Sequence, residues 1–443
     1  MVPPPGDRGL EGFEMKSRKK EKSEVRKTRK KNFMERLLDG VAVEWKPLGE
    51  VSELRRGRVM SKEYLAANAG DYPVYSSQTA NNGQIGKINT FDFDGEFVSW
   101  TTDGANAGTV FYRKDKFSIT NVCGLIKVNN NSELNYKYLF YWLSIEAQKH
   151  VYSGMGNPKL MSHQVEKIPI PIPCPDNPEK SIKIQTEIVR ILDTFTELTA
   201  ELTAELTARK KQYTYYRDQL LSFPEPVEGE EGGTTKYTKS TKGVEWKTLG
   251  EIGEFVRGNG LQKSDFTETG VPAIHYGQIY TYYGLFTTET KSFVSSHLAN
   301  RLRKAQKGDL IIATTSENIE DVCKPLVWLG DDEACVSGET YIFKHNQNPK
   351  FIAYYLQTPM FFDYKQRNRT GTKVIRVHGD KLAEFQIPVP SPEEQARIVA
   401  ILDKFDALTT SITEGLPREI ELRQKQYEYY RNMLLTFPEA EGV

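Results

Sequence analysis

Loops rich in Asn, Gln, Ser, Thr, Arg and Lys are the parts of this 443-residue chain whose side chains could do chemistry. Arg and Lys hydrogen-bond guanine, Asn and Gln hydrogen-bond adenine, and Ser and Thr can bond to either base. Lys and Arg also hold the phosphate backbone of a duplex. Any one of these loops is at least equally well explained as an ordinary solvated turn. The prediction of DNA contact therefore depends on their occurrence at matched places in two halves of the chain.

The candidate DNA-contacting residues form one set in each half. In the first half they are Ser76, Ser77, Gln78, Thr79, Asn81, Asn82, Thr101, Thr102, Asn106, Arg113 and Lys114. In the second half they are Tyr276, Gln278, Arg301, Arg303, Lys304, Thr314, Thr315, Ser316, Gln366, Arg367, Asn368, Arg369, Thr370 and Lys373. The stretch Gln366–Arg369 is the strongest patch, because it combines arginines with amides and contains no acidic residue.

Catalytic signatures are absent from the sequence. It has no GxxxxGK[ST] loop, no HExxH and no GxSxG motif. Its Asn-Pro pairs at Asn157, Asn177 and Asn348 precede Lys or Glu, whereas an amino-methyltransferase would place an aromatic residue there to stack a flipped base. Its four cysteines and six histidines show no metal-ligand spacing. We therefore expect no catalytic residues, no metal ligands and no cofactor in this chain.

Composition and charge are those of a soluble protein. Charged residues make up 27% and hydrophobic residues 38% of the chain, and no apolar run approaches the roughly 18 residues of a membrane span. No secretory signal is visible at the N-terminus, so a cytoplasmic location is expected. The 59 basic and 59 acidic residues cancel. This balance neither supports nor excludes a nucleic-acid partner.

A heptad pattern between Gln185 and Glu225 predicts one long helix that must position these loops. Its apolar positions alternate in steps of four and three, which is the spacing of a coiled-coil seam. The seam residues are Ile188, Leu192, Phe195, Leu202, Leu206, Tyr213, Tyr216 and Leu220, with Thr199 and Arg209 completing the alternation. One helix cannot bury such a seam alone, so a second coiled-coil helix is required.

The chain itself supplies the second helix, between Gln395 and Glu439. Both segments contain an Ile-Leu-Asp-x-Phe block and end in Phe-Pro-Glu. The second seam consists of Ile398, Leu402, Phe405, Ile412, Tyr427, Tyr430 and Leu434. The second copy has gained about four residues, near Gly415 and Pro417. An insertion of this size is a stutter in a coiled coil, and Gly with Pro predicts a kink there.

The segments around the helices repeat as well, because VEWKPLGEV at Val43–Val51 returns as VEWKTLGEI at Val244–Ile252. We therefore predict an internal duplication. Its parts are a basic disordered extension at 1–33, a globular domain at 34–178, a helix at 179–224, a flexible linker at 225–243, a second globular domain at 244–390 and a second helix at 391–438. The extension and the linker contain almost nothing that can be buried.

Both globular regions are predicted to mix strands and helices. Aromatic helical patterns occur at Tyr136–Val151 and Lys350–Met360, and Gln366–Lys373 is expected to be a loop. Ile168–Pro175 and Ile387–Pro390 are expected to be extended edges, since proline is excluded from central strands. The predicted strands are Tyr72–Ser76, Phe97–Thr102, Thr109–Arg113, Cys123–Val128, Val271–Gly277, Asp309–Thr315, Pro325–Gly330 and Thr340–Lys344.

The predicted fold class is α+β. It consists of two similar mixed α/β globules separated by two long antiparallel coiled-coil helices, with an internal pseudo-two-fold duplication. Two similar surfaces held at a fixed separation would suit a molecule that measures distance between two contacts.

The chain resembles the DNA-specificity subunit of type I restriction–modification enzymes, and the IC subfamily in particular. The resemblance is carried by VEWKxLGE at both globule starts, PIPCPDNPEKS at Pro171–Ser181, tandem TAEL at Thr199–Leu206 and ITEGLPREIELRQKQYEYYR at Ile412–Arg431. It covers the chain from about residue 34 to residue 439. The N-terminal basic arm and the Thr/Lys-rich linker depart from the pattern of the family.

The resemblance implies two target-recognition domains, each reading one half of a split, asymmetric site in double-stranded DNA. It implies that two modification subunits dock along the helices and methylate adenine N6 with S-adenosylmethionine. A restriction subunit, which is a motor-nuclease using ATP and Mg, would add translocation and cleavage. The chain itself would have no activity alone.

The TAEL repeat has a physical interpretation beside the one that the family implies. Four helical residues add about 6 Å, and one base pair rises about 3.4 Å. These lengths limit the added gap to less than about two base pairs, and we expect a further TAEL unit after Leu206 to lengthen the gap between half-sites by about one base pair. The plainer alternative is that TAEL is merely a good helix sequence.

Two other functions remain open from the sequence. The chain could be a coiled-coil scaffold or adaptor whose globules bind proteins, or a self-contained DNA methyltransferase or nuclease. Salt-dependent, sequence-selective DNA binding would separate recognition from the adaptor. Methylation by the purified chain alone would support the enzyme, against which the missing catalytic motifs count.

Overall fold

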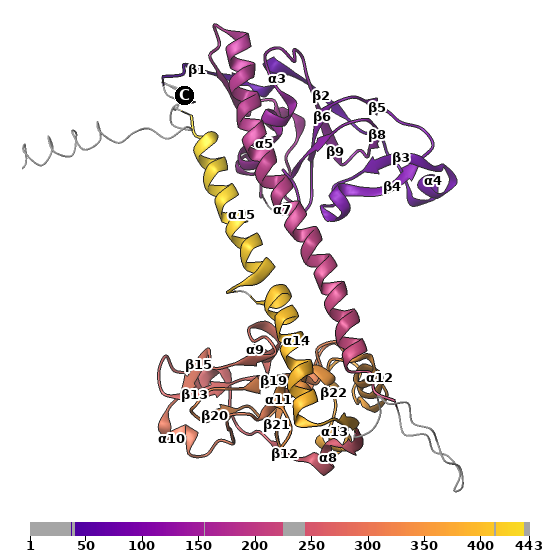
Figure 1. The fold of residues 1–443 in the computed structure, drawn as a ribbon. Coiled ribbons are helices and arrows are strands. Elements are labelled where there is room, and N and C mark those ends of the chain that lie inside the picture. The colour runs from indigo at the N-terminus through magenta and orange to yellow at the C-terminus, as the bar shows by residue number, and fades with distance from the viewer. Residues whose placement is uncertain (1–36, 38–39, 155, 225–243, 412, 438–443) are drawn as a thin grey trace, which may run out of the picture. The chain divides into compact units, whose positions relative to one another are not determined.

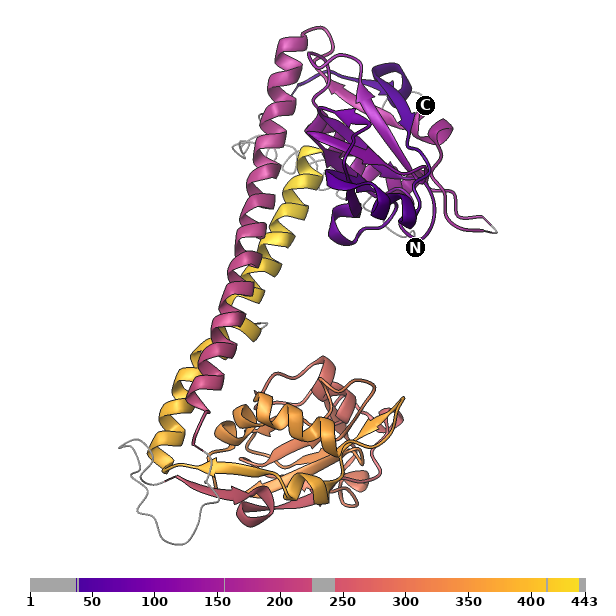
Figure 2. The ribbon, with the colours of Figure 1, turned by 90° about the vertical axis from the view of Figure 1, so that its right-hand side faces the viewer.

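The computed structural model describes residue 37 and residues 40–154, 156–224, 244–411 and 413–437. It divides into two compact units. Unit 1 comprises Met1–Leu198 with Arg423–Val443, and unit 2 comprises Thr199–Leu422. Figures 1 and 2 show the elements of both units from two directions.

Several predictions fall on residues that are not described. They are the disordered extension at 1–33, the flexible linker at 225–243 and the seam residue Ile412.

Unit 1 is built from short strands and helices. Its elements in chain order are β1 (Val43–Pro47), α3 (Leu48–Val51), β2 (Ser52–Arg56), α4 (Lys62–Ala67), β3 (Ala69–Tyr75), the 3₁₀ turn η1 (Ala80–Gly83), β4 (Gln84–Ile88), β5 (Phe93–Asp94), β6 (Phe97–Thr101), β7 (Val110–Arg113), β8 (Lys116–Ile119), β9 (Cys123–Val128), α5 (Tyr136–Glu146), the 3₁₀ turn η2 (Ala147–His150), α6 (Ser162–Val165) and β10 (Pro169–Pro173). The first part of α7 (Pro178–Leu220) and the last part of α15 (Gly415–Leu434) complete it.

The strands of unit 1 form three sheets, with orders β2-β9-β6-β7, β4-β3-β8-β5 and β1-β10. Every residue of β6 is buried, which fits its unbroken run of apolar and small residues. Strand β10 pairs with β1 in an antiparallel two-stranded ribbon, and it has no second partner strand among the described residues. Its alternating prolines lack the N–H groups that a central strand needs, so the predicted extended edge is confirmed.

The core of unit 1 lies where α5 meets the first part of α7. Tyr138 and Trp142 of α5 are buried in one cluster with Ile188 and Leu192 of α7. Each aromatic ring also bonds the proline-rich ribbon, since Trp142 Nε1 donates to the Pro169 carbonyl at 2.9 Å. Apolar contacts of these rings therefore hold the globule against α7, while their polar atoms bond the ribbon.

Unit 2 repeats this plan with more elements. In chain order it contains the last part of α7, then β11 (Glu245–Thr248), α8 (Leu249–Ile252), β12 (Gly253–Arg257), the 3₁₀ turn η3 (Lys263–Asp265), β13 (Val271–Ile274), α9 (Tyr276–Thr281), β14 (Phe286–Thr287), β15 (Ser292–Val294), α10 (Ser296–Ala299), β16 (Lys304–Ala305), β17 (Leu310–Ala313), β18 (Thr315–Ser316), β19 (Lys324–Trp328), β20 (Ala334–Val336), β21 (Thr340–His345), α11 (Pro349–Tyr355), α12 (Pro359–Asn368), β22 (Ile375–Arg376), α13 (Gly379–Ala383), β23 (Gln386–Val389) and α14 (Pro392–Thr410).

The sheets of unit 2 correspond to those of unit 1, with additions. Their orders are β12-β21-β17-β19-β14, β15-β13-β20-β16, β11-β23 and β18-β22. Strand β17 is wholly buried between β19 and β21, as β6 is between its neighbours. Phe351 and Tyr355 of α11 share a buried cluster with Ile398 and Leu402 of α14. The predicted helix and strand order thus recurs around a second core.

A polar clamp of the same geometry ties each globule to its helix. In both units a lysine and a tyrosine of one short helix bind a single aspartate of a long helix. The contacts are Lys137 Nζ to Asp193 Oδ2 at 2.6 Å and Tyr141 hydroxyl to Asp193 Oδ1 at 2.7 Å, then Lys350 Nζ to Asp403 Oδ2 at 2.7 Å and Tyr354 hydroxyl to Asp403 Oδ1 at 2.7 Å.

The long helices pair within each unit through equivalent aromatic stacks. In unit 1, Phe195 of α7 stacks on Tyr430 of α15 with ring centroids 5.2 Å apart. In unit 2, Phe405 of α14 stacks on Tyr216 of α7 at 5.6 Å. An early phenylalanine of one copy meets a late tyrosine of the other in both units, which is the order expected for antiparallel helices.

The predicted seam residues differ in burial. Ile188, Leu192, Ile398, Leu402 and Leu434 have no exposed surface, and Tyr213 is also buried. Phe195, Leu202, Leu206, Leu220, Phe405, Tyr427 and Tyr430 are half-buried. Tyr216 is 40% exposed, so one side of its ring faces solvent although the other stacks on Phe405.

The predicted kink in the second helix is a complete break. Helix α14 ends at Thr410 and α15 begins at Gly415, whose φ is +76°. A Cβ atom at Gly415 would lie 2.4 Å from the Ala407 carbonyl oxygen. Only glycine fits this left-handed close approach, so the inserted residues terminate the helix instead of bending it.

Three element predictions are corrected by the structure. The strand expected at Val271–Gly277 ends at Ile274, because His275 caps the short helix α9. The loop expected at Gln366–Lys373 begins only after Asn368, since α12 extends to that residue. The helix expected at Tyr136–Val151 changes to a 3₁₀ turn after Glu146.

Candidate nucleic-acid interface

A short turn between β8 and β9 joins two of the predicted loops of unit 1. The Thr120 hydroxyl donates to Ser76 Oγ at 2.9 Å. The N–H and the hydroxyl of Thr102 both donate to the Val122 carbonyl, at 3.1 and 3.0 Å. The loop after β3 and the loop after β6 are therefore fixed on the same turn.

Unit 2 repeats this arrangement around the turn between β20 and β21. The N–H of Tyr276 donates to Ser337 Oγ at 2.9 Å. The N–H and the hydroxyl of Thr314 both donate to the Glu339 carbonyl, at 3.1 and 3.4 Å. The segments after β13 and β17 thus lie on a turn that matches the one in unit 1.

A third loop joins each of these turns. In unit 1 the N–H of Leu160 donates to the Thr102 carbonyl at 2.8 Å, and the N–H of Gly104 donates to the Pro158 carbonyl at 3.0 Å. In unit 2 the N–H of Val377 donates to the Thr314 carbonyl at 3.2 Å. We call the resulting surface the loop edge. It consists of residues 76–83, 102–106, 120–122, 152–154 and 156–159 in unit 1, and of residues 275–278, 314–316, 337–339 and 369–376 in unit 2.

The third loops carry residues that the candidate set does not contain. Lys159 and Tyr152 are exposed in unit 1, and Arg376 is exposed in unit 2, 3.9 Å from Glu339. The Gly/Asn-rich stretch before Lys159 is a turn signal in the sequence. Its place at the edge follows from long-range hydrogen bonds that no local pattern indicates.

The predicted DNA contacts at Thr101, Thr102, Thr314 and Thr315 are corrected by the structure, because these side chains are buried. Each hydroxyl is bonded to protein. Thr101 donates to the Asn106 carbonyl, and Thr315 donates to Glu339 Oε2 at 2.6 Å. These threonines therefore shape the loop edge from beneath its surface.

The tip of the β3–β4 hairpin exposes two amide side chains of unit 1. Asn81 and Asn82 have left-handed φ values of 50° and 53°, and Gly83 follows with φ 79°. Asparagine tolerates this region better than other residues that have a side chain. Both asparagines are exposed, and the bidentate amide geometry that matches adenine is available on each.

Arg113 supports this tip from inside the protein, and it is a further correction to the candidate set. Only 2% of the residue is exposed. Its Nη1 donates to the Asn82 carbonyl at 2.9 Å, and its Nε donates to Ser99 Oγ at 3.0 Å. The guanidinium lies 3.6 Å from the Tyr75 ring centroid. Burial lowers the pKa of Arg113 to about 10, which still leaves it charged at neutral pH. Arg113 therefore positions the tip from inside the protein, and its burial argues against the predicted contact.

The other candidates of unit 1 occupy different environments. Gln78 and Thr79 are exposed beside the tip, although Gln78 Nε2 donates to the Gln84 carbonyl at 2.6 Å. Half-buried Asn106 donates to the Ser77 carbonyl at 3.4 Å, which joins the two loops. Lys114 is exposed and directly follows Arg113, which pairs with the first residue of β6.

Exposed arginines of unit 2 lie next to its loop edge. Asn259 binds the backbone of this segment, since its Nδ2 donates to the Arg301 carbonyl at 2.8 Å and its Oδ1 accepts from the Arg303 N–H at 2.7 Å. Arg301 and Arg303 are exposed, whereas Lys304 is half-buried and lies 3.3 Å from Glu333. The two arginines extend the exposed basic surface beside the loop edge, and the lysine is engaged within the protein.

The Gln366–Lys373 stretch combines a helix end with the third loop of unit 2. Gln366, Arg367, Arg369, Thr370 and Lys373 are exposed, and Asn368 is half-buried with its amide donating to the Tyr364 carbonyl at 2.9 Å. The loop is closed by backbone bonds between Thr370 and Arg376, at 2.8 and 2.9 Å. Its exposed basic residues therefore stand partly on the end of α12 and partly on a hydrogen-bonded hairpin, where the sequence predicts one open loop.

The remaining candidates of unit 2 are bonded within the protein. Gln278 Nε2 donates to Ser292 Oγ at 2.6 Å, and its Oε1 accepts from the His275 N–H at 3.0 Å. Tyr276 and Ser316 are half-buried, and the Ser316 hydroxyl accepts from the Asn318 N–H at 3.3 Å. Gln278 is therefore satisfied without a base, which argues against the predicted contact.

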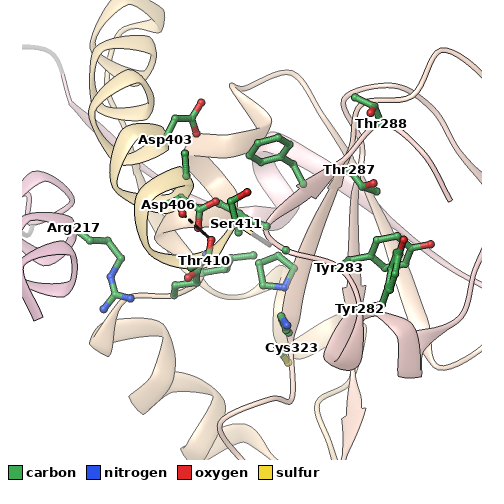
Figure 3. A pocket seen from close by; sticks show the side chains of 18 of the residues that line it. Arg217, Tyr282, Tyr283, Thr287, Thr288, Cys323, Asp403, Asp406, Thr410 and Ser411 are labelled. Atoms are coloured by element: carbon green, nitrogen blue, oxygen red, sulfur yellow. Dashed lines mark hydrogen bonds between the residues drawn. The ribbon is translucent and has the colours of Figure 1, made fainter. Parts of the chain in front are cut away.

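A cavity of about 890 Å³ lies in unit 2, and none of its lining residues belongs to the loop edge. Figure 3 shows Asp403, Asp406 and Thr410 of α14 on one side and Tyr282 and Tyr283 on the other. The Thr410 hydroxyl donates to Asp406 at 2.8 Å, and burial raises the pKa of this aspartate.

The cavity also contains a thiol, that of Cys323. Burial raises the pKa of this thiol to about 12, so it remains protonated at neutral pH and is a poor nucleophile. Among the described residues, no group of three or more His, Cys, Asp or Glu could hold a metal ion. No helix in the described part of the chain is long and apolar enough to cross a membrane.

The type I restriction modification DNA specificity domain matches the chain twice, at residues 41–209 and 241–422. The chain belongs to this family. Each match covers one globule and part of a long helix, so the predicted resemblance and the predicted duplication are confirmed.

Relatives of known name agree with this assignment. The specificity subunit of the Escherichia coli type I restriction enzyme EcoR124I/EcoR124II is 38% identical over 431 residues, which are 93% of this chain and 98% of that protein. A putative type I specificity subunit of Mycoplasma pneumoniae is 33% identical over 396 residues, covering 89% of this chain and 98% of that protein.

A solved structure shares the fold. The S subunit of a type I restriction–modification system from M. genitalium superimposes with a TM-score of 0.56 at 15% identity, covering 91% of this chain and 98% of that chain. The predicted α+β class is thereby confirmed. The chain is a DNA specificity subunit of a type I restriction–modification system.

Proposed function

We propose that each unit reads one half of a split, asymmetric DNA site through its loop edge. The observation that carries this proposal is the matched pair of turns, on which the two units expose different side chains. In unit 1 the edge ends in the amides of Asn81 and Asn82, and in unit 2 it carries Arg369 and Lys373. A shared framework with different exposed donors is what two readers of different sequences require.

The proposal extends to the assembly in which this chain works. Two modification subunits, which bind S-adenosylmethionine, would dock along the long helices and methylate adenine N6 in each half-site. Restriction subunits using ATP and Mg would add cleavage, and the chain alone would have no activity. The family match and the named relatives support this assembly, and we infer that it acts on DNA in the cytoplasm.

The long helices are proposed to set the spacing between half-sites. Helix α7 continues without interruption from Pro178 to Leu220 and contains both TAEL units of Thr199–Leu206. In those units only Thr199, Leu202 and Leu206 are half-buried, with Ala200, Glu201 and the others exposed. A segment with so little packing can change length at little cost to either globule.

Single-molecule methylation sequencing tests the proposed function. The chain is expressed with its neighbouring modification subunit in a host that lacks adenine methylation, and a plasmid is sequenced. We expect a split motif with one methylated adenine in each half, on opposite strands. The modification subunit expressed alone is the control and should leave no motif.

An unmethylated plasmid, in cells that contain a stable complex of the two proteins, would contradict the proposal. The globules would then be binding something other than DNA, as in a coiled-coil adaptor. Pull-down of duplex DNA by the same complex would show whether binding or only methylation has failed.

A further inference from the structure

The strand that leads into each loop edge ends at an arginine, and a glycine follows it in both units. Strand β2 ends at Arg56 and is followed by Gly57, and strand β12 ends at Arg257 and is followed by Gly258. Both pairs stand at the same distance from the repeated VEWK segment. Neither arginine belongs to the candidate set derived from the loops.

The glycines are required by the close approach of this strand end to the turn. A Cβ atom at Gly57 would lie 2.2 Å from the Ile119 carbonyl oxygen, and one at Gly258 would lie 2.1 Å from the Ser337 carbonyl oxygen. Distances this short do not occur between real Cβ atoms and carbonyl oxygens, so a side chain is excluded at both positions. The preceding arginine is thereby held against the turn that organises the loop edge.

Both arginines reach the central residue of that turn. Arg56 Nη2 donates to the Asn121 carbonyl at 3.3 Å, and Arg257 Nε donates to the Gly338 carbonyl at 3.1 Å. Both residues are exposed. A guanidinium has five N–H donors, so one bond to a carbonyl orients the group and leaves most of its donors facing outward.

Neighbouring arginines in unit 1 are neutralised, which distinguishes Arg56 from them. Arg55 binds Glu53 through two bonds at 3.1 and 2.9 Å, and Arg58 binds Asp92 at 3.2 and 3.0 Å. Within the described residues no carboxylate pairs with Arg56 or with Arg257. The two arginines that the turns orient, Arg56 and Arg257, therefore carry a charge that no described carboxylate compensates.

Residues that recur in both units cannot read sequences that differ between the half-sites. What the two half-sites share is the phosphate backbone, to which a guanidinium donates in bidentate fashion. We propose that Arg56 and Arg257 are a matched pair of phosphate contacts, each fixing the DNA backbone beside its half-site independently of the base sequence. This inference rests on the proposed function and adds the residues that position the duplex.

The test measures affinity against salt for the full chain in complex with its modification subunit. The probes are two fluorescent duplexes of equal length, one with the methylated motif and one with it scrambled. Arg56→Gln and Arg257→Gln should each reduce the slope of log affinity against log salt by about 0.9 on both duplexes. Each should weaken binding roughly three- to tenfold, and the double variant should lose about two units of slope. The methylated motif should stay the same.

Two further variants separate charge from folding. Arg56→Lys keeps the positive charge and should retain the wild-type slope. Arg55→Gln, one residue earlier on the same strand, removes an arginine that is already paired with Glu53, so the slope should not change. A thermal melt of each variant confirms that the unit is folded.

An unchanged slope in folded Arg56→Gln and Arg257→Gln would overturn the inference, and the arginines would be braces of the turn only. A loss confined to the duplex with the motif, or a changed motif, would also overturn it in favour of base contact. Absence of any motif with the wild-type complex would instead contradict the proposed function itself, so the two failures are distinguishable.

Discussion

The turn that organises the loop edge is built from equivalent bonds in units 1 and 2. Thr102 and Thr314 each donate twice to one carbonyl of the turn, and an exposed arginine donates to the residue before it. What stands on this turn differs. Unit 1 has a left-handed tip that exposes Asn81 and Asn82, whereas unit 2 has the helix α9 at the corresponding place.

This comparison separates two kinds of residue in the molecule. Buried threonines, glycines and clamp residues recur, because a hydrogen-bonded turn against a sheet tolerates few alternatives. Exposed residues at the tips differ, because no packing constrains them. The recurring residues form the framework, and the differing ones are where sequence specificity can change without loss of the fold.

The largest expected effect comes from the matched glycines. Gly57→Ala and Gly258→Ala should each lower the free energy of unfolding by about 2–3 kcal/mol, because a Cβ atom would overlap a carbonyl oxygen of the turn. Chemical denaturation gives the size, and hydrogen exchange should locate each loss in its own unit. Gly284→Ala is the control, since nothing lies within 4 Å of the added atom. If only one of the two substitutions lowers the free energy of unfolding, the two turns are not built alike and the comparison fails for the other unit.

The clamp between globule and helix should give the next largest effect. Asp193→Ala and Asp403→Ala each remove a carboxylate that accepts from a lysine and a tyrosine. Each should cost about 1–3 kcal/mol, with faster hydrogen exchange in α5 for the first variant and in α11 for the second. Exposed Asp71→Ala should change stability by less than about 0.5 kcal/mol. Unequal losses would mean that the two globules are anchored differently.

An effect on one half-site only is expected from Arg113. Arg113→Met removes the bond to the Asn82 carbonyl and loosens the tip of unit 1. Base discrimination should fall by about 1 kcal/mol, roughly fivefold, in the half-site read by unit 1 and not in the other half. Methylation sequencing measures both halves in one experiment. Relaxation in both halves would show global destabilisation instead of a local role.

The smallest energetic effect is expected from a change in the length of α7. Insertion of one TAEL unit after Leu206 should lengthen the gap by about one base pair and leave both half-sites unchanged. Affinity for the lengthened site should match that of the original pair. Replacement of Thr203–Leu206 by another helical tetrapeptide of equal length is the control and should keep the gap. A motif with the original gap would contradict the proposed role of α7.

Much of the architecture could be predicted from repetition in the sequence. The repeated VEWK segments, the two heptad helices and the break near Gly415 are all local patterns, and helices and strands follow such patterns because side chains face one side at a fixed period. Predictions failed where tertiary contacts override the local preference of the sequence. Tyr276 is helical although its neighbours favour a strand, since His275 caps the turn and Gln278 completes the cap.

The candidate site was predicted less well, because exposure is not a local property. Thr102 and Arg113 have the chemistry of DNA-contacting residues, but long-range pairing buries both. Arg56 and Arg257 were missed because each sits at a strand end outside any polar loop. Comparison of the two copies residue by residue after VEWK would have found them.

The sequence by itself determined the duplication, the long helices, the absence of catalytic signatures and the family. These follow from residue order and period, which are visible without coordinates. Only the tertiary structure decided which polar residues face outward, which loops share an edge and which arginines lack a carboxylate partner. Those properties depend on hydrogen bonds and packing between segments far apart in the chain, such as Thr102 with Val122 and Arg257 with Gly338.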